Sequence, residues 1–169
     1  MKKIILLSIG CMMSILTFGR NHVSENATIV ADTIFYTSNM LSAVNRADAS
    51  YYRLLLKAGK GTNTQDMFQD FYLDGTLKAE GSYSFIDLSN DANTILNGEI
   101  TTYYVNGKER WHGHYVNGKR HGYFTLQMRD GSIAVVEFVN GKSKYDYYTV
   151  TNPDGNMQKH SISELKSLL

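Results

Sequence analysis

The segment that decides the fold is Trp111-His112-Gly113-His114-Tyr115-Val116-Asn117-Gly118-Lys119-Arg120-His121-Gly122. Its centre, Asn117-Gly118, is typical of a two-residue hairpin turn, because a type I′ turn needs a positive φ at both central residues. The aromatic and β-branched side chains beside the turn favour strands. The segment therefore predicts an antiparallel hairpin with a fixed register. The predicted cross-strand pairs are Tyr115 with Arg120, His114 with His121, and His112 with Tyr123.

Similar pairs of Asp or Asn with Gly recur along residues 66–155. They are Asp74-Gly75, Asn97-Gly98, Asn106-Gly107, Asn117-Gly118, Asp130-Gly131, Asn140-Gly141 and Asp154-Gly155. A spacing of 24 residues separates Gly107, Gly131 and Gly155, and the same spacing separates Gly98, Gly122 and Asp146. A fixed period that holds two hairpin-linked strands indicates a repeat array. An earlier copy opens at Asp66, and Ser84 to Ala92 is the expected insertion between copies.

The repeats predict an all-β fold: an elongated antiparallel sheet of consecutive β-hairpin repeats with a period of about 24 residues. Strands are also expected at residues 33–36 and 51–57, the second of them paired with residues 67–73. A loose capping box at Ser161 to Glu164 predicts a short C-terminal helix that covers the open sheet edge. The predicted division is residues 1–19 as a signal peptide, 20–65 as N-terminal strands and loop, 66–155 as hairpin repeats, and 156–169 as a C-terminal tail or short helix.

The quoted segment has the pattern aromatic-x-Gly-x4-Gly-x3-Gly and closely resembles the MORN repeat, whose consensus is Tyr-x-Gly-x-aromatic-x-Asn-Gly-Lys-x-x-Gly. Ala79-Glu80-Gly81-Ser82-Tyr83 resembles a second copy, and Val135 to Asp146 resembles a third, in which Val136 and Tyr145 replace two family glycines. These departures and the longer spacing are similar to MORN-variant modules of bacterial envelope proteins and of certain proteins described as antitoxins. The resemblance implies a ladder of hairpins that acts as a scaffold or binding surface and does not imply an enzyme.

The N-terminus has the layout of a bacterial secretory signal peptide. Met1-Lys2-Lys3 precedes an apolar run from Ile4 to Phe18, which is shorter than the roughly 20 residues that span a bilayer. Cleavage after Gly19 is the main expectation, while lipidation at Cys11 and an uncleaved anchor stay open as alternatives. The predicted location is the periplasm or cell envelope, with secretion also open. Membrane contact is expected only through the signal or a lipid anchor.

Charge and cysteine content exclude several classes of function. The chain has 17 Lys and Arg against 16 Asp and Glu, which gives no polycationic surface for nucleic acid. Cleavage after Gly19 would leave 15 basic and 16 acidic residues and no cysteine, which excludes thiol catalysis and cysteine zinc sites in the mature chain. The pair Asp66 and Asp70 shares one face of a strand and is expected to be solvated.

Alternation along the predicted strands separates two faces. Taking Asn106-Gly107 as a second two-residue turn places Thr102 opposite Trp111. One face, here called the core face, collects Ile100, Tyr104, Trp111, Tyr115, Phe124 and Leu126. The other, the polar face, collects Tyr103, Arg110, His112, His114, Lys119, His121 and Tyr123. The core face is expected to be buried, so that a ligand would have to bind the polar face. The register after Gly131 stays undetermined.

The sequence predicts a non-enzymatic interaction or scaffold module of the cell envelope, with a protein or an envelope component as the partner. The candidate binding residues are Tyr103, Arg110, His112, His114, His121 and Tyr123. No cofactor and no catalytic residue are predicted. The alternatives are an antitoxin- or immunity-like inhibitor and a metal-binding protein that uses the cluster His112, His114 and His121, although no acidic residue is expected beside those imidazoles. The oligomeric state is undetermined.

Overall fold

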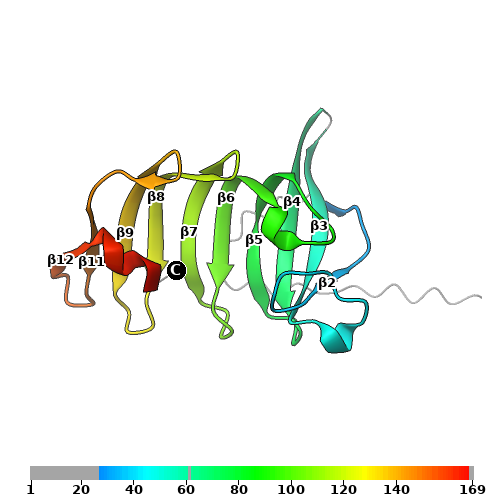
Figure 1. Cartoon of the computed structure of the whole chain (residues 1–169), viewed down its shortest axis with the longest axis horizontal. Helices are drawn as coiled ribbons and strands as arrows, with labels where there is room; N and C mark the ends of the chain where they lie inside the picture. Colours follow the sequence, from blue (N-terminus) through cyan, green and yellow to red (C-terminus); the bar gives the residue numbers. More distant parts are fainter. Residues whose placement is uncertain (1–26, 61, 168–169) are drawn as a thin grey trace, which may run out of the picture.

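The computed structural model describes residues 27–60 and 62–167, which form one 12-stranded antiparallel sheet (Figure 1). Neighbouring strands mostly follow each other in the chain, in the order β1-β3-β4-β5-β6-β7-β8-β9-β11-β12, while β2 pairs with β3 and β10 with β9. The strands are β1 (Thr28–Ile29), β2 (Ile34–Tyr36), β3 (Tyr51–Lys60), β4 (Asn63–Tyr72), β5 (Leu77–Phe85), β6 (Ile95–Tyr103), β7 (Glu109–Val116), β8 (Lys119–Gln127), β9 (Ile133–Val139), β10 (Lys142–Ser143), β11 (Tyr147–Thr151) and β12 (Met157–Ser161). The predicted all-β sheet of consecutive hairpins is confirmed. The predicted signal peptide, residues 1–19, lies outside the described residues.

Three short 3-10 helices accompany the sheet. They are η1 (Arg46–Asp48), η2 (Asp91–Asn93) and η3 (Ile162–Ser167). Within the described residues no helix is both long and apolar enough to cross a membrane. Helix η3 occupies the place of the predicted C-terminal helix, but it lies against the face of the sheet and not along its open edge, because Leu165 and Ile162 pack on the apolar side chains of β8, β9 and β11.

Six of the seven Asx-Gly pairs form turns, which are of two kinds, whereas Asn97-Gly98 lies inside β6. At Asn117-Gly118 and Asn140-Gly141 both residues have a positive φ, as the type I′ prediction requires. At Asp74, Asn106, Asp130 and Asp154 only the following glycine has a positive φ, and the turn spans five residues. In each of these turns the backbone N–H of the first residue donates to the carbonyl of the fifth, for example Tyr104 to Lys108 at 2.8 Å. The prediction of a two-residue turn at Asn106-Gly107 is therefore wrong.

Gly98 and Gly122 are not turn residues, although they share the 24-residue spacing. Both have a positive φ inside a strand, at 113° and 79°. The pairing of β7 with β8 shifts between His112 and His114, so that His112 pairs with Thr125 and not with Tyr123. The predicted pairs of Tyr115 with Arg120, His114 with His121 and Thr102 with Trp111 are confirmed. A β-bulge of this kind cannot be read from alternation, because β8 has three residues between these two pairs, Gly122 to Phe124, where β7 has only Gly113.

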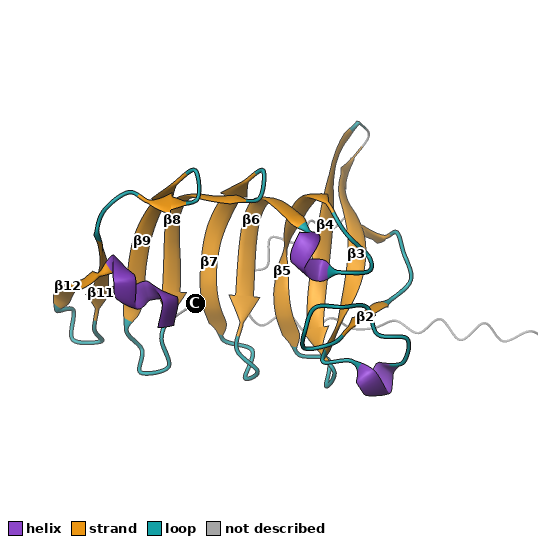
Figure 2. Cartoon of the chain, viewed as in Figure 1, coloured by secondary structure: helices purple, strands orange, loops and turns teal. Residues whose placement is uncertain are grey.

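The core face is covered at its two ends. Figure 2 shows η2 and η3 in front of the same face of the sheet, with β6 and β7 between them. One apolar cluster contains Phe124, Leu126, Ala134, Val136, Phe138, Tyr148 and Leu165, and the other contains Leu55, Phe68, Ala79 and Ile100. Trp111 and Tyr115 are half-buried and pack against both clusters. The expectation of a fully buried core face is therefore wrong at its centre.

Tyr104 is the one predicted member of the core face that lies outside a strand. It begins the turn that links β6 to β7, and its hydroxyl donates to the carbonyl of Gln127 at 2.9 Å. The other five predicted residues lie on that face, and Ile100, Phe124 and Leu126 are buried. Asp66 is half-exposed, as predicted, and pairs with Lys57 at 3.5 Å. Asp70 was expected to be solvated as well, but it is buried.

The loop between β5 and β6 is the predicted insertion, and it is held onto the sheet by polar contacts. Asp91 of η2 accepts hydrogen bonds from Tyr51 at 2.7 Å and from Arg53 Nη2 at 3.0 Å, both on β3. The hydroxyl of Tyr36, on β2, donates to the carbonyl of Asp87 at 3.3 Å. These contacts place η2 over β3 and β4.

Acid is expected to loosen this loop. The Asp87 carboxylate accepts hydrogen bonds from Asn93 Nδ2 at 2.9 Å and from Ser89 Oγ at 2.6 Å, and these bonds hold the pKa of Asp87 below its usual range. A lowered pKa stabilises the loop above the ordinary value of about 3.9, and this contribution is lost as the pH falls below it. Hydrogen exchange of residues 87–94, corrected for intrinsic rates, should accelerate below that value and not between neutrality and pH 5. The Asp87→Asn variant should lack this acceleration, and an unchanged acid response in that variant would contradict the assignment.

Candidate binding site

The centre of the polar face is a cluster of close polar contacts built from β6 and β7. The carboxylate of Glu99 bridges two imidazoles, with Oε2 at 3.0 Å from His112 Nε2 and Oε1 at 2.8 Å from His114 Nδ1. The second ring nitrogen of His112, Nδ1, lies 2.9 Å from Thr101 Oγ1. Glu99 is paired with His114 across the ladder, and residues 99 and 101 face the same way because side chains alternate along a strand. The expectation that no acidic residue accompanies these histidines is wrong.

Next to this cluster lies a hollow of about 650 Å³ over β3–β7. Three carboxylates line it, those of Glu80, Glu99 and Glu109, and none of the described lining residues is Lys or Arg. Tyr103 and His112 also contribute to its wall, as do neutral polar groups such as Gln65 and Thr101. The hollow therefore presents negative charge beside an imidazole and a phenol.

Glu80 and Tyr103, both in the lining of this hollow, are hydrogen-bonded to each other. The Tyr103 hydroxyl donates to Glu80 Oε1 at 2.6 Å, and Gln69 Nε2 donates to Glu80 Oε2 at 3.1 Å. Burial and this hydrogen bond raise the pKa of Tyr103 above its ordinary value. Tyr103 therefore stays protonated and remains a donor at neutral pH, and the position of the Glu80 carboxylate is fixed by two donors.

The structure does not bring all six predicted site residues together in one site. Tyr103 and His112 line the acidic hollow, and His114 is linked to it through Glu99. His121 is exposed opposite His114, and Tyr123, which is 66% exposed, pairs with Glu137. Neither His121 nor Tyr123 lines the hollow. The bulge at Gly122 separates Tyr123 from His112.

Arg110 lines a second hollow. Its position depends on a β-bulge, which the alternation of side chains along a strand does not predict. Tyr103 pairs with Glu109 while Thr102 pairs with Trp111, so that Arg110 is the extra residue of a bulge. Its guanidinium carbon lies 6.0 Å from the ring centroid of Tyr104. The prediction that Arg110 shares a register with Tyr103 is therefore wrong, although both residues line this second hollow.

The histidine cluster does not provide the ligand set of a metal site. In the part of the chain that the structure describes, no group of three or more His, Cys, Asp or Glu side chains is arranged to hold a metal ion. The contacts of His112 and His114 are with Glu99 and Thr101, while His121 lies on the next strand.

Sequence reasoning missed Glu80, Glu99 and Glu109. The signal for Glu99 was present, because the correct pairing of Thr102 with Trp111 also places Glu99 opposite His114. Glu80 could not be placed in this way, because its pairing with Thr101 joins strands on either side of the predicted insertion, and Glu109 depends on the bulge.

No model of a known protein family matches the chain, and the comparison with curated proteins also gives no match. The resemblance to the MORN repeat therefore stays a prediction.

Proposed function

We propose that this chain is a non-enzymatic binding module of the cell envelope, and that its acidic hollow receives a basic side chain of a partner protein. The observation that supports this proposal is the set of three carboxylates, Glu80, Glu99 and Glu109, around one hollow whose described lining contains no Lys or Arg. A concave site with one sign of charge concentrates ligands of the opposite sign. The same charge disfavours a nucleic-acid phosphate backbone at this face.

The partners of these carboxylates favour recognition over catalysis. Both oxygens of Glu80 accept from donors of the chain itself, and both oxygens of Glu99 lie next to imidazoles. A carboxylate held by several donors keeps its position when a partner binds, so less ordering is needed on association. Tyr103 adds a half-buried ring, which is the kind of anchor enriched at protein interfaces.

The envelope location in this proposal depends on the apolar N-terminal run and not on the sheet. An exported immunity-like inhibitor could use the same hollow, and the identity of the partner distinguishes it from a scaffold. A captured toxin or hydrolase that loses activity on binding would favour the inhibitor. A captured structural component of the envelope would favour the scaffold.

Neutralising the hollow is expected to abolish capture of the partner. In a pull-down from an envelope fraction, the double variant Glu80→Gln/Glu109→Gln should retain roughly a tenth or less of the partner, since each lost charged contact is worth about 1.5–3 kcal/mol. The matched control is Asp48→Asn/Asp154→Asn, which also removes two negative charges, at the exposed helix η1 and at the exposed β11–β12 turn. Its capture should equal that of the unmodified protein.

Three outcomes would contradict the proposal. Full capture by Glu80→Gln/Glu109→Gln, with an unchanged melting temperature, would place the interface elsewhere. Equal loss in the control Asp48→Asn/Asp154→Asn would mean that overall charge, and not this hollow, governs the interaction. Turnover of a substrate by the purified protein would contradict the non-enzymatic assignment.

A further inference from the structure

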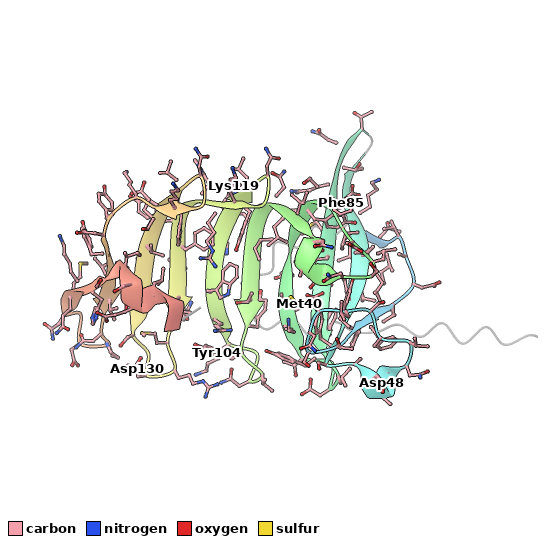
Figure 3. The ribbon with its side chains drawn as sticks, viewed as in Figure 1. Met40, Asp48, Phe85, Tyr104, Lys119 and Asp130 are labelled. Carbon is pink, nitrogen blue, oxygen red and sulfur yellow. The ribbon has the colours of Figure 1, made fainter. Side chains whose placement is uncertain are left out.

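A second hollow, of about 930 Å³, lies at the edge of the sheet where the β6–β7 and β8–β9 turns project. Figure 3 labels Tyr104 and Asp130 on these two turns, which lie on the same edge of the sheet. Three tyrosines and three cations line this hollow: Tyr72, Tyr103, Tyr104, Lys108, Arg110 and Arg129. Its volume lies within the range of about 300–1,000 Å³ that is usual for small-molecule sites.

The two turns hold their side chains in defined positions. In the first, Tyr104 N donates to the carbonyl of Lys108 and Gly107 N to the carbonyl of Tyr104, both at 2.8 Å. In the second, Met128 N donates to the carbonyl of Ser132 at 2.8 Å, and Ser132 N donates to Asp130 Oδ1 at 2.9 Å. Lys108 and Arg129 therefore extend from hydrogen-bonded turns, which favours a site that exists before a ligand arrives.

Positive charge gathers around the ring of Tyr104. The guanidinium carbons of Arg129 and Arg110 lie 5.4 Å and 6.0 Å from its centroid, within the range of a cation–π contact. Arg129 and Lys108 form no ion pair with any carboxylate in the described residues. Among the described lining residues Glu109 is the single acidic one. Lys108 and Arg129 alone outnumber this described carboxylate, so an anion is the favoured ligand.

The rest of the lining indicates what kind of anion fits. Leu126 and Met128 add apolar surface beside the tyrosine rings. A guanidinium matches the two oxygens of a carboxylate, while aromatic side chains pack against flat, partly apolar rings. Asn106 and Gln127 also line the hollow, and side-chain amides pair with hydroxyl groups. A ligand that carries a carboxylate on a hydroxylated ring fits all of these features.

We propose that this basic, tyrosine-lined hollow binds an acidic saccharide, with the carboxylate at Arg129 and Lys108 and the sugar ring against the tyrosines. This site is separate from the acidic hollow of the proposed function and has the opposite charge. The two hollows share a wall formed by Tyr103 and Glu109. A protein partner and a saccharide could therefore be held side by side.

Calorimetric titration of the full chain with trigalacturonate tests this proposal. The unmodified protein should bind it, and Arg129→Gln should weaken binding roughly tenfold or more, the loss expected for one charge-assisted hydrogen bond. The matched control is Lys142→Gln, which also removes one positive charge but lies on β10, the strand that follows the Asn140-Gly141 turn. It should bind with unchanged affinity. Glu99→Gln, which lines the acidic hollow and not the basic one, should also bind trigalacturonate normally, even if it no longer captures a protein partner.

Three results would overturn the proposal. The first is an absence of trigalacturonate binding by the unmodified protein. The second is equal binding of the neutral trisaccharide maltotriose, or displacement of trigalacturonate by inorganic phosphate at equal concentration, because either would remove the need for a carboxylated sugar. The third is equal weakening in Arg129→Gln and Lys142→Gln, which would attribute binding to overall charge. Circular dichroism of each variant separates these results from misfolding.

Discussion

The variant Arg53→Met is expected to lower the free energy of unfolding by about 3–5 kcal/mol, as is found when one partner of a buried ion pair is removed. Arg53 and Asp70 are each 2% exposed, and their side chains form a bidentate pair at 2.6 and 2.8 Å between β3 and β4. Arg53 also pairs with Asp91 of the loop between β5 and β6. Removing the guanidinium would leave the Asp70 carboxylate buried without a cation. Denaturant unfolding followed by tryptophan fluorescence measures this loss.

The matched control lies on the same two strands. Lys57 and Asp66 form an exposed ion pair, also between β3 and β4, so Lys57→Met should change the free energy of unfolding by about 1 kcal/mol or less. The double variant Arg53→Met/Asp70→Leu should regain part of the lost stability, because it removes both buried charges together. Equal effects of Arg53→Met and Lys57→Met would show that the network around Arg53 does not stabilise the fold.

The variant Phe124→Ala is also expected to cost about 3–5 kcal/mol, the usual loss for truncating a buried phenylalanine. Phe124 is 4% exposed, and its ring centroid lies 5.7 Å from that of Trp111 and 5.1 Å from that of Phe138. A Cβ at Gly113 would lie 2.3 Å from the Phe124 ring, so the ring fills the space that this glycine leaves. Truncation would open a cavity between β7 and β9. Thermal and denaturant unfolding provide the measurement.

The control for Phe124 is the triple replacement of His112, His114 and His121 by serine on the opposite face. Glu99, which contacts His112 and His114, has a 62% exposed side chain, so the triple variant should lose about 1 kcal/mol or less. A triple variant that unfolds as readily as Phe124→Ala would contradict the assignment of the two faces.

The fold could be predicted from the sequence because glycines recur at the 24-residue period of the hairpin repeats. Gly107, Gly131 and Gly155 have a positive φ in equivalent turns. This backbone requirement does not depend on the sequence of the strands that the turns connect. The register beyond these turns could not be predicted fully, since a five-residue turn followed by a bulge gives the same pairing of Thr102 with Trp111 as a two-residue turn does. The predicted faces were therefore correct near Trp111 and wrong at Arg110.

The candidate site was harder to predict than the fold, because the presence of a charged residue in the sequence does not indicate whether its side chain is buried or exposed. Asp66 and Asp70 lie on the same face of β4. Only Asp70 forms an ion pair with an arginine, Arg53, beneath the loop between β5 and β6. The acidic hollow likewise needs side chains from β5, β6 and β7 together, and their convergence depends on pairings between repeats. The three histidines can be recognised as a motif in the sequence. The contact of Glu99 with His112 and His114 can be inferred only from the pairing of β6 with β7.

The order of the strands also has a consequence for how the chain folds. From β3 to β9 each strand pairs with its neighbour in sequence, so contacts form over short loops and each hairpin can nucleate locally. The contacts that hold the loop between β5 and β6 are different, because Arg53 and Asp91 are 38 residues apart and Tyr36 and Asp87 are 51 apart. Closing such long loops costs more entropy. We therefore expect the ladder to assemble rapidly and the cover over β3 and β4 to dock as a later kinetic step.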